Sequence, residues 1–108
     1  MIHSPTELAA DLKRYYEVVN QVYPVKGMFL FGSYARETMH KDSDIDVAVV
    51  VDRIPGQTKI DIGAKLFSLA AKVNVDIEPK CIFWDEYIDP PQASILQEII
   101  STGKEIEG

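Results

Sequence analysis

The sequence predicts an α/β or α+β fold in which a small β-sheet is flanked by helices. Segments with apolar residues at helical spacing alternate along the chain with short, strongly apolar segments that have the character of strands. The chain has 108 residues, of which 46% are hydrophobic, so we expect one compact domain over residues 1–108. These patterns leave the order and direction of the strands open.

The first predicted helix begins near Ser4 and ends before Pro24. Ser4 can cap it, Pro5 suits the first helical position, and Glu7 completes a capping box. Its apolar residues recur at helical spacing, namely Leu8, Leu12, Tyr15 or Tyr16, Val19 and Val22. Two strands follow: "VKGMFLFG", which ends at Gly32, and "DIDVAVVV", which is rich in β-branched residues and is closed by the turn signal "DRIPGQ".

Three further elements are expected after that turn. The segment "TKIDIGAKLFSLAAKV" has the pattern of an amphipathic helix over residues 58–73. The segment "VNVDIEPKCIF" alternates polar and apolar residues, which predicts a third strand over residues 73–83 that is interrupted or bent at Pro79. The segment "PPQASILQEIISTGKEIEG" indicates a last helix that Gly103 stops.

Charge and cysteine content exclude several classes of function. The formal net charge is -6 and the basic residues are scattered, which argues against broad binding to nucleic acid. An anionic small molecule is still allowed, because a bound divalent metal would reverse the local field. The one cysteine, Cys81, cannot form an internal disulfide. A single cysteine fits a reducing compartment, so we expect a cytoplasmic protein, and neither a signal-peptide pattern nor a membrane-length apolar stretch is present.

Two aspartates stand at the head of the second strand. Because a strand has a period of two, Asp44 and Asp46 project from one face, while Ile45 and Val47 on the other face can enter a core. Two close carboxylates repel each other unless solvent reaches them or a cation binds between them. Mg²⁺ accepts a few carboxylate oxygens together with water and substrate phosphates. Taken alone, this pair also fits an ordinary solvated strand end.

The end of the first strand carries residues that suit a phosphate. Gly32 allows close approach of the backbone, Ser33 adds a hydroxyl, and the N–H groups of a helix starting there would attract an anion. Arg36 could pair with the same phosphate. Ser43, directly before the aspartates, could brace the loop by hydrogen bonding, although a plain turn residue would look the same.

The combination of "GS", ten intervening residues and "DID" at the head of an apolar strand resembles the signature of the DNA polymerase β-type nucleotidyltransferase superfamily. More narrowly, the chain resembles the minimal nucleotidyltransferases (MNT-type domains), which often pair with HEPN-family proteins in toxin–antitoxin modules. The resemblance implies the polymerase β-type fold, a small mixed β-sheet flanked by helices. The sequence departs from the family pattern at Glu37, because a glycine usually follows the arginine.

The resemblance also implies roles for the residues of these motifs. Asp44 and Asp46 would ligate two Mg²⁺ ions around a nucleoside triphosphate, which Gly32, Ser33 and Arg36 would contact. A third carboxylate on a neighbouring strand would ligate the ion that activates the acceptor. The segment "VNVDIEP" offers Asp76 and Glu78 for it, and their spacing does not choose between the two, although Glu78 lies nearer the end of the strand.

The implied function is transfer of AMP from ATP to a hydroxyl of a partner protein, a HEPN-like toxin. The alternative is an antitoxin that acts only by binding its partner, with a nucleotide pocket that does no chemistry. Nucleotide transfer to RNA or to a small molecule fits less well, because the chain has no basic groove to hold the acceptor. The sequence does not determine the oligomeric state.

Overall fold

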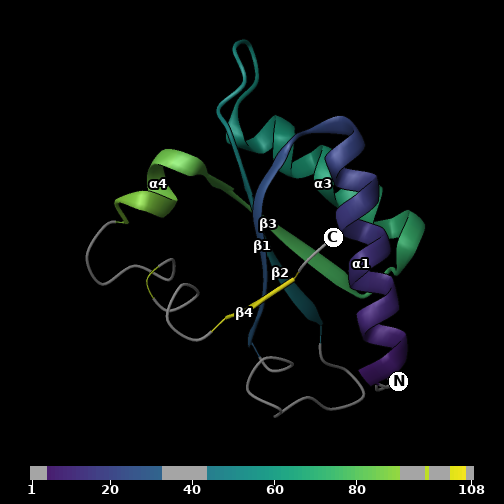
Figure 1. Cartoon of the computed structure of the whole chain (residues 1–108). Helices are drawn as coiled ribbons and strands as arrows, with labels where there is room; N and C mark the ends of the chain where they lie inside the picture. The colour runs from purple at the N-terminus through teal and green to yellow at the C-terminus, as the bar shows by residue number, and fades with distance from the viewer. Residues whose placement is uncertain (1–4, 33–43, 91–96, 98–102, 107–108) are drawn as a thin grey trace.

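The computed structural model describes residues 5–32, 44–90, 97 and 103–106. Its helices are α1 (Pro5–Val22), α3 (Lys59–Val73) and α4 (Trp84–Ile88), and its strands are β1 (Val25–Phe31), β2 (Ile45–Val51), β3 (Ile77–Phe83) and β4 (Lys104–Glu105). The strands form one sheet in the order β3-β2-β1-β4 (Figure 1). β1 is antiparallel to β2 and β4, whereas β3 is parallel to β2. The expectation of a small mixed sheet flanked by helices is therefore confirmed.

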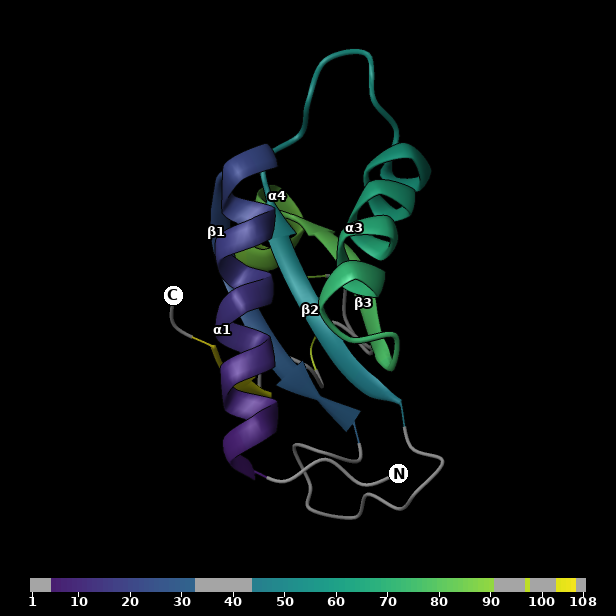
Figure 2. The ribbon, with the colours of Figure 1, turned by 90° about the vertical axis from the view of Figure 1, so that its right-hand side faces the viewer.

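Helices α1 and α3 lie side by side on one face of the sheet, and α4 lies behind it (Figure 2). Their apolar stripes meet the inward side chains of the strands in one core, in which β2 contributes Ile45, Val47, Val49 and Val51. The opposite face carries a smaller apolar cluster, made of Phe29, Ala48, Val50 and Ile82, with Phe31 and Tyr87 packed against it. Alternate residues of β2 thus face two different environments, as the period of a strand requires.

Tyr15 ties the two large helices together. Its side chain is fully buried, and its hydroxyl donates a hydrogen bond to the backbone carbonyl of Leu66 on α3 at 2.9 Å. Burial raises the pKa of this hydroxyl well above its ordinary value. The helical spacing left Tyr15 and Tyr16 as alternatives for the core stripe, and Tyr15 is the one that occupies it.

Helix α3 has a defined start. Thr58 forms a capping box, because its hydroxyl accepts a hydrogen bond from the Asp61 N–H while the Asp61 carboxylate accepts one from the Thr58 N–H. The inner side of the helix buries Ile62, Leu66 and Leu69 against the sheet and α1. The prediction of an amphipathic helix here is confirmed.

The third strand starts later than the alternation predicted. Val73 ends α3, the Asn74 N–H continues the helical hydrogen bonds to Ala70, and Val75 is 78% exposed, so the strand begins at Ile77. The strand also runs unbroken through Pro79, where an interruption or bend was expected. A proline is tolerated there because β3 is an edge strand of the sheet, so one side of its backbone needs no ladder partner.

The end of the chain also differs from the prediction. Lys104 and Glu105 form β4, which pairs with Leu30 and Phe29 of β1 at the sheet edge. The last predicted helix, over residues 90–103, falls largely outside the described residues. Among the described residues, no helix is long and apolar enough to cross a membrane.

Candidate active site

Three acidic residues lie at one end of the sheet, where β1 ends and β2 and β3 begin. Asp46 is the cross-strand neighbour of Phe31 on β1 and of Glu78 on β3, and Asp44 directly precedes β2. Their strand neighbours Ile45 and Ile77 are buried in the core under α1 and α3. The carboxylates of Asp46 and Glu78 therefore face away from these helices, on the second face of the sheet. We call Asp44, Asp46 and Glu78 the acidic row.

The electrostatics of the acidic row reflect crowding. Glu78 shares a side-chain hydrogen bond with Asp44, and this bond, followed by burial and by the charges of Asp44 and Asp46, raises the pKa of Glu78. The pKa of Asp46 is raised first by burial and then by the charge of Asp44. Asp46 and Glu78 are thus both harder to ionise than ordinary carboxyls, and the negative charge of Asp44 contributes to both shifts in pKa.

Gly32 approaches Asp46 closely. Its backbone has φ +71°, a conformation that favours glycine, and a Cβ at this position would overlap the Oδ2 atom of Asp46. The sequence predicted that Gly32 would let the backbone approach a phosphate. The structure adds a second reason for glycine, namely its contact with one of the carboxylates. Gly32 therefore joins the acidic row to the end of β1.

Asp76, the alternative third carboxylate, lies just before β3. Its backbone carbonyl accepts a hydrogen bond from the Ile45 N–H at 2.8 Å, and its own N–H donates to the Asn74 side chain at 2.9 Å. These backbone contacts fix the start of β3 against the start of β2. Glu78, in contrast, is the residue opposite Asp46 in the register, and the Asp44 side chain raises its pKa. The geometry thus favours Glu78 as the third member of the row.

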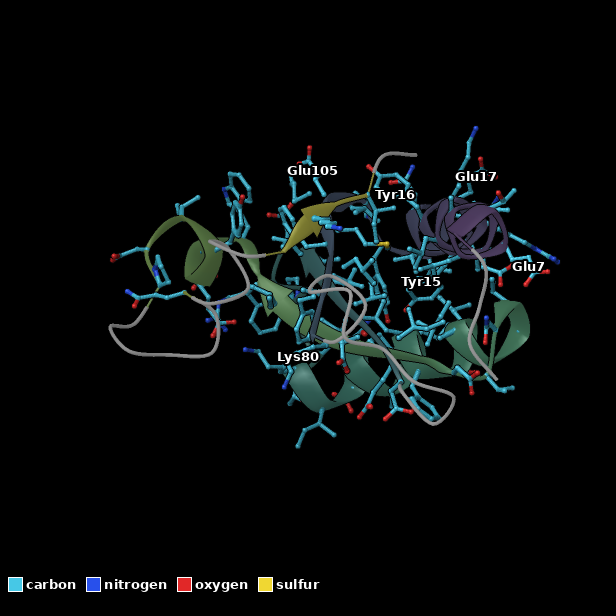
Figure 3. The ribbon with its side chains drawn as sticks, turned by 90° about the horizontal axis from the view of Figure 1, so that it is seen from below. Glu7, Tyr15, Tyr16, Glu17, Lys80 and Glu105 are labelled. Carbon is cyan, nitrogen blue, oxygen red and sulfur yellow. The ribbon has the colours of Figure 1, made fainter. Side chains whose placement is uncertain are left out.

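Lys80 is a site residue that the sequence reasoning missed. It lies on β3 opposite Ala48, one step along the same face from the pair Asp46 and Glu78, and its positive charge lowers the pKa of both carboxyls (Figure 3). Within the described ranges Lys80 makes no ion pair. The sequence does hold a signal for Lys80. It follows Glu78 by two residues in a predicted strand, so both side chains lie on one face.

The chemistry of the acidic row suits a hard divalent cation. Carboxylate oxygens are the ligands that Mg²⁺ prefers, and a cation would relieve the repulsion that raises the pKa of Asp46 and Glu78. In the part of the chain that the structure describes, no three His, Cys, Asp or Glu side chains are already arranged as a ligand set. The Asp44 side chain is instead the main reason why the pKa of Glu78 is raised.

A separate pocket of about 560 Å³ opens at the other end of the sheet, between the β2–α3 connection and α4. Its two cations are already paired: Arg53 with Asp85 at 2.8 Å, and Lys59 with Glu86 at 2.5 Å. The Arg53 guanidinium also lies 4.4 Å from the centre of the Phe83 ring. These contacts give the cations a structural role in joining α4 to the sheet.

Three other predicted site residues, Ser33, Arg36 and Ser43, lie outside the described residues, as does Glu37, the departure from the family pattern. The acidic row and Gly32 are therefore the part of the predicted site whose geometry is defined.

A known protein family matches the part of the chain that contains this site. Residues 12–101 match the family described as "Nucleotidyltransferase domain", a segment that contains Gly32 and the whole acidic row. The chain belongs to this family. The predicted resemblance to the minimal nucleotidyltransferases, and with it the class of enzyme, is confirmed at this level.

Two relatives and one solved structure illustrate the similarity. The protein adenylyltransferase MntA of Shewanella oneidensis is 32% identical over 84 residues, which cover 75% of this chain but only 52% of MntA. A candidate protein adenylyltransferase of Methanocaldococcus jannaschii, MJ0128, is 28% identical over 95 residues, which cover 88% of this chain and 94% of that protein. The chain thus spans about half the length of MntA but nearly all of MJ0128.

A crystal structure of a toxin–antitoxin with AMP-PNP has a similar fold. It aligns with a TM-score of 0.63 and 23% sequence identity, and the match covers 94% of this chain and 73% of that chain. At this identity the similarity concerns the fold.

Proposed function

We propose that this chain transfers AMP from ATP to a hydroxyl of a partner protein, in a Mg²⁺-dependent reaction, as the nucleotidyltransferase of a toxin–antitoxin pair whose toxin is HEPN-like. The observation that carries the proposal is the convergence of Asp44, Asp46 and Glu78 beside Gly32. The names of its relatives, which are protein adenylyltransferases, support the choice of AMP and of a protein acceptor. We place the reaction in the cytoplasm, where ATP is available.

In this proposal Asp44 and Asp46 hold the metal ions, and Glu78 completes the ligand set on the side of β3. Bound Mg²⁺ would neutralise phosphate charge and lower the pKa of the acceptor hydroxyl. A bond forms between the acceptor oxygen and the α-phosphorus, the bond from that phosphorus to the pyrophosphate oxygen breaks, and the hydroxyl proton passes to solvent. Gly32 keeps the end of β1 close to Asp46, and Ser33 and Arg36 remain the predicted phosphate contacts.

The partial burial of Asp46 affects how strongly its carboxylate can hold a cation. Asp46 is only partly exposed, and burial is the main reason why its pKa is raised. A carboxylate in such a position interacts more strongly with a cation than a fully solvated one does, because less water screens the charges. Asp46 is therefore better suited to retain an ion than an aspartate at a fully solvated strand end.

The test uses ATP labelled at the α-phosphate, Mg²⁺ and the product of an adjacent gene as acceptor. We expect label on the acceptor with the wild-type chain, and none with Asp44→Asn, Asp46→Asn or excess chelator. The matched control is Asp52→Asn, because Asp52 is an exposed aspartate just beyond the other end of β2 that pairs only weakly with Lys26, at 3.5 Å. Label that persists in both variants of the acidic row would overturn the assignment.

A second function is favoured by one observation: among the described residues, no three His, Cys, Asp or Glu side chains are arranged as a ligand set. A chain that only binds and neutralises its partner would need no metal at this site. In the same experiment, this function predicts a stable complex without label, and equal complex formation by the wild-type chain and Asp44→Asn.

A further inference from the structure

Lys80 is an exposed cation on the face of the sheet that carries the acidic row (Figure 3). It lies on β3 two residues after Glu78, and it is opposite Ala48, which follows Asp46 by two residues on β2. Two residues span about 6–7 Å along a strand, and neighbouring strands lie about 4.8 Å apart. Lys80 is therefore one position away from both carboxyls, a distance that its flexible four-carbon side chain can cross.

The charge of Lys80 acts on the acidic row without being bound by it. It lowers the pKa of both Asp46 and Glu78, so the ammonium group lies within electrostatic range of both. Within the described residues, however, Lys80 forms no ion pair. Arg53 and Lys59 differ in this respect, because each is paired with an acidic residue of α4. The charge of Lys80 is therefore available to a ligand.

The neighbours of Lys80 favour one direction for its ammonium group. Farther along the same face lie Ile82 and Val50, which are buried in the smaller apolar cluster. An ammonium group loses hydration over apolar surface, so it is more stable on the side of the solvent and the acidic row. The row is thus bordered on the β3 side by a cation, while Gly32 approaches Asp46 on the side of β1.

The balance of charges selects a class of ligand for this arrangement. Lys80 repels a divalent cation that binds alone to the carboxylates beside it, and the ionised row repels an anion that binds alone. A metal ion that carries a phosphate chain satisfies both, because the ion meets the carboxylates and a phosphate oxygen meets the ammonium group. Three carboxylates and a triphosphate also carry more negative charge than two divalent ions neutralise, so a further cation stabilises the complex.

We propose that Lys80 is a substrate-binding residue whose ammonium group contacts a non-bridging phosphate oxygen of the metal-bound nucleotide. The inference rests on the proposed function, because it assumes that the acidic row holds Mg²⁺ together with a nucleoside triphosphate. It adds a phosphate contact from β3 to those already predicted at the end of β1. An ammonium group is a compact charge with three donors, which suits a phosphate. Lys80 stays protonated throughout transfer and acts by charge and orientation, so no bond to it forms or breaks.

The test compares the binding of two ligands to the full chain by calorimetric titration. One ligand is Mg²⁺ alone, and the other is Mg²⁺ with α,β-methylene ATP, in which a methylene group replaces the oxygen that transfer would release. Lys80→Ala should weaken binding of the nucleotide at least tenfold, because a hydrogen bond between charged groups is lost. The same variant should bind Mg²⁺ alone more tightly than the wild-type chain does. A damaged fold would weaken both, so the opposite signs identify a contact with phosphate.

Two further variants control for charge and for folding. Lys65→Ala removes the same formal charge from an exposed position on α3, which packs on the other face of the sheet (Figure 2). It should change both affinities less than twofold. Lys80→Arg keeps the charge and should bind the nucleotide within about threefold of the wild-type chain. Both substituted positions are exposed, so thermal unfolding should give nearly the same Tm for all variants.

Three results would overturn the inference. The first is unchanged nucleotide binding in Lys80→Ala, the second is equal weakening of both ligands in that variant, and the third is an equal loss of nucleotide binding in Lys65→Ala. The outcome is separable from that of the proposed function. AMP transfer by a chain whose nucleotide binding is independent of Lys80 would refute this inference alone. Nucleotide binding that depends on Lys80, without label on any acceptor, would support it and refute the transfer.

Discussion

Replacing Gly32 with alanine tests the link between the end of β1 and the acidic row. A side chain at φ +71° destabilises the folded state by about 1–2 kcal/mol, because the left-handed conformation crowds a Cβ. The new Cβ would also overlap Asp46 Oδ2 and would lie only 3.1 Å from Asp46 Cγ and 3.3 Å from Asp46 Cβ. Rotating the carboxylate relieves the contact with Oδ2 but not those with Cγ and Cβ. We therefore expect overpacking to lower the free energy of unfolding by a further ~1–3 kcal/mol.

Gly56→Ala separates these two effects. Gly56 has φ +84° in the turn before α3, and a Cβ there would meet nothing within 4 Å. Gly56→Ala should therefore lower the free energy of unfolding only by the backbone contribution of about 1–2 kcal/mol. For a small domain, each kcal/mol lost lowers the Tm by roughly 4–8 °C. Gly32→Ala should lose more stability, about 2–5 kcal/mol in all, and should still fold at low temperature.

The decisive comparison is between stability and ligand binding. Urea unfolding gives the free energy of unfolding of both variants, and calorimetric titration gives their affinity for Mg²⁺ with a non-hydrolysable ATP analogue. We expect Gly56→Ala to bind like the wild-type chain and Gly32→Ala to bind at least tenfold more weakly, because Asp46 is displaced. Wild-type affinity in Gly32→Ala, or equal loss of stability in the two variants, would refute the reasoning.

Three other predictions follow from the electrostatics and the core. The pKa of Glu78 is raised in the folded chain, so its contribution to stability is present at low pH and is lost as the pH rises through the folded pKa. Glu78→Gln should therefore flatten the fall in the free energy of unfolding as the pH rises past the ordinary pKa of a glutamate, which urea unfolding across pH would measure. Lys80→Ala should tighten binding of Mg²⁺ alone, measured calorimetrically, since Lys80 opposes a second cation beside Asp46; weaker binding would contradict this. Tyr15→Phe should lower the free energy of unfolding by about 1 kcal/mol through loss of the hydrogen bond to Leu66, and an unchanged Tm would contradict it.

Local patterns were sufficient for much of the fold. Helix α1 follows from apolar spacing together with start signals such as Pro5, and α3 follows from apolar spacing, because these patterns act within one or two turns of the chain. The strand that begins at Ile45 follows equally from its run of β-branched residues. The same patterns misplaced the start of β3, because the alternation from Val73 onward continues unchanged across the end of a helix and a turn.

The sequence by itself determined that Asp44 and Asp46 share a face and that a glycine ends the strand before them, since both features depend on the period of a strand and on adjacent residues. Only the tertiary structure decided that Glu78 rather than Asp76 lies opposite Asp46, that Lys80 joins them, and that β4 closes the sheet edge. These pairings depend on register, which is set by hydrogen bonds and packing between segments some thirty to seventy-five residues apart. No local spacing encodes that register, because a strand can slide against its neighbour without changing its own periodicity.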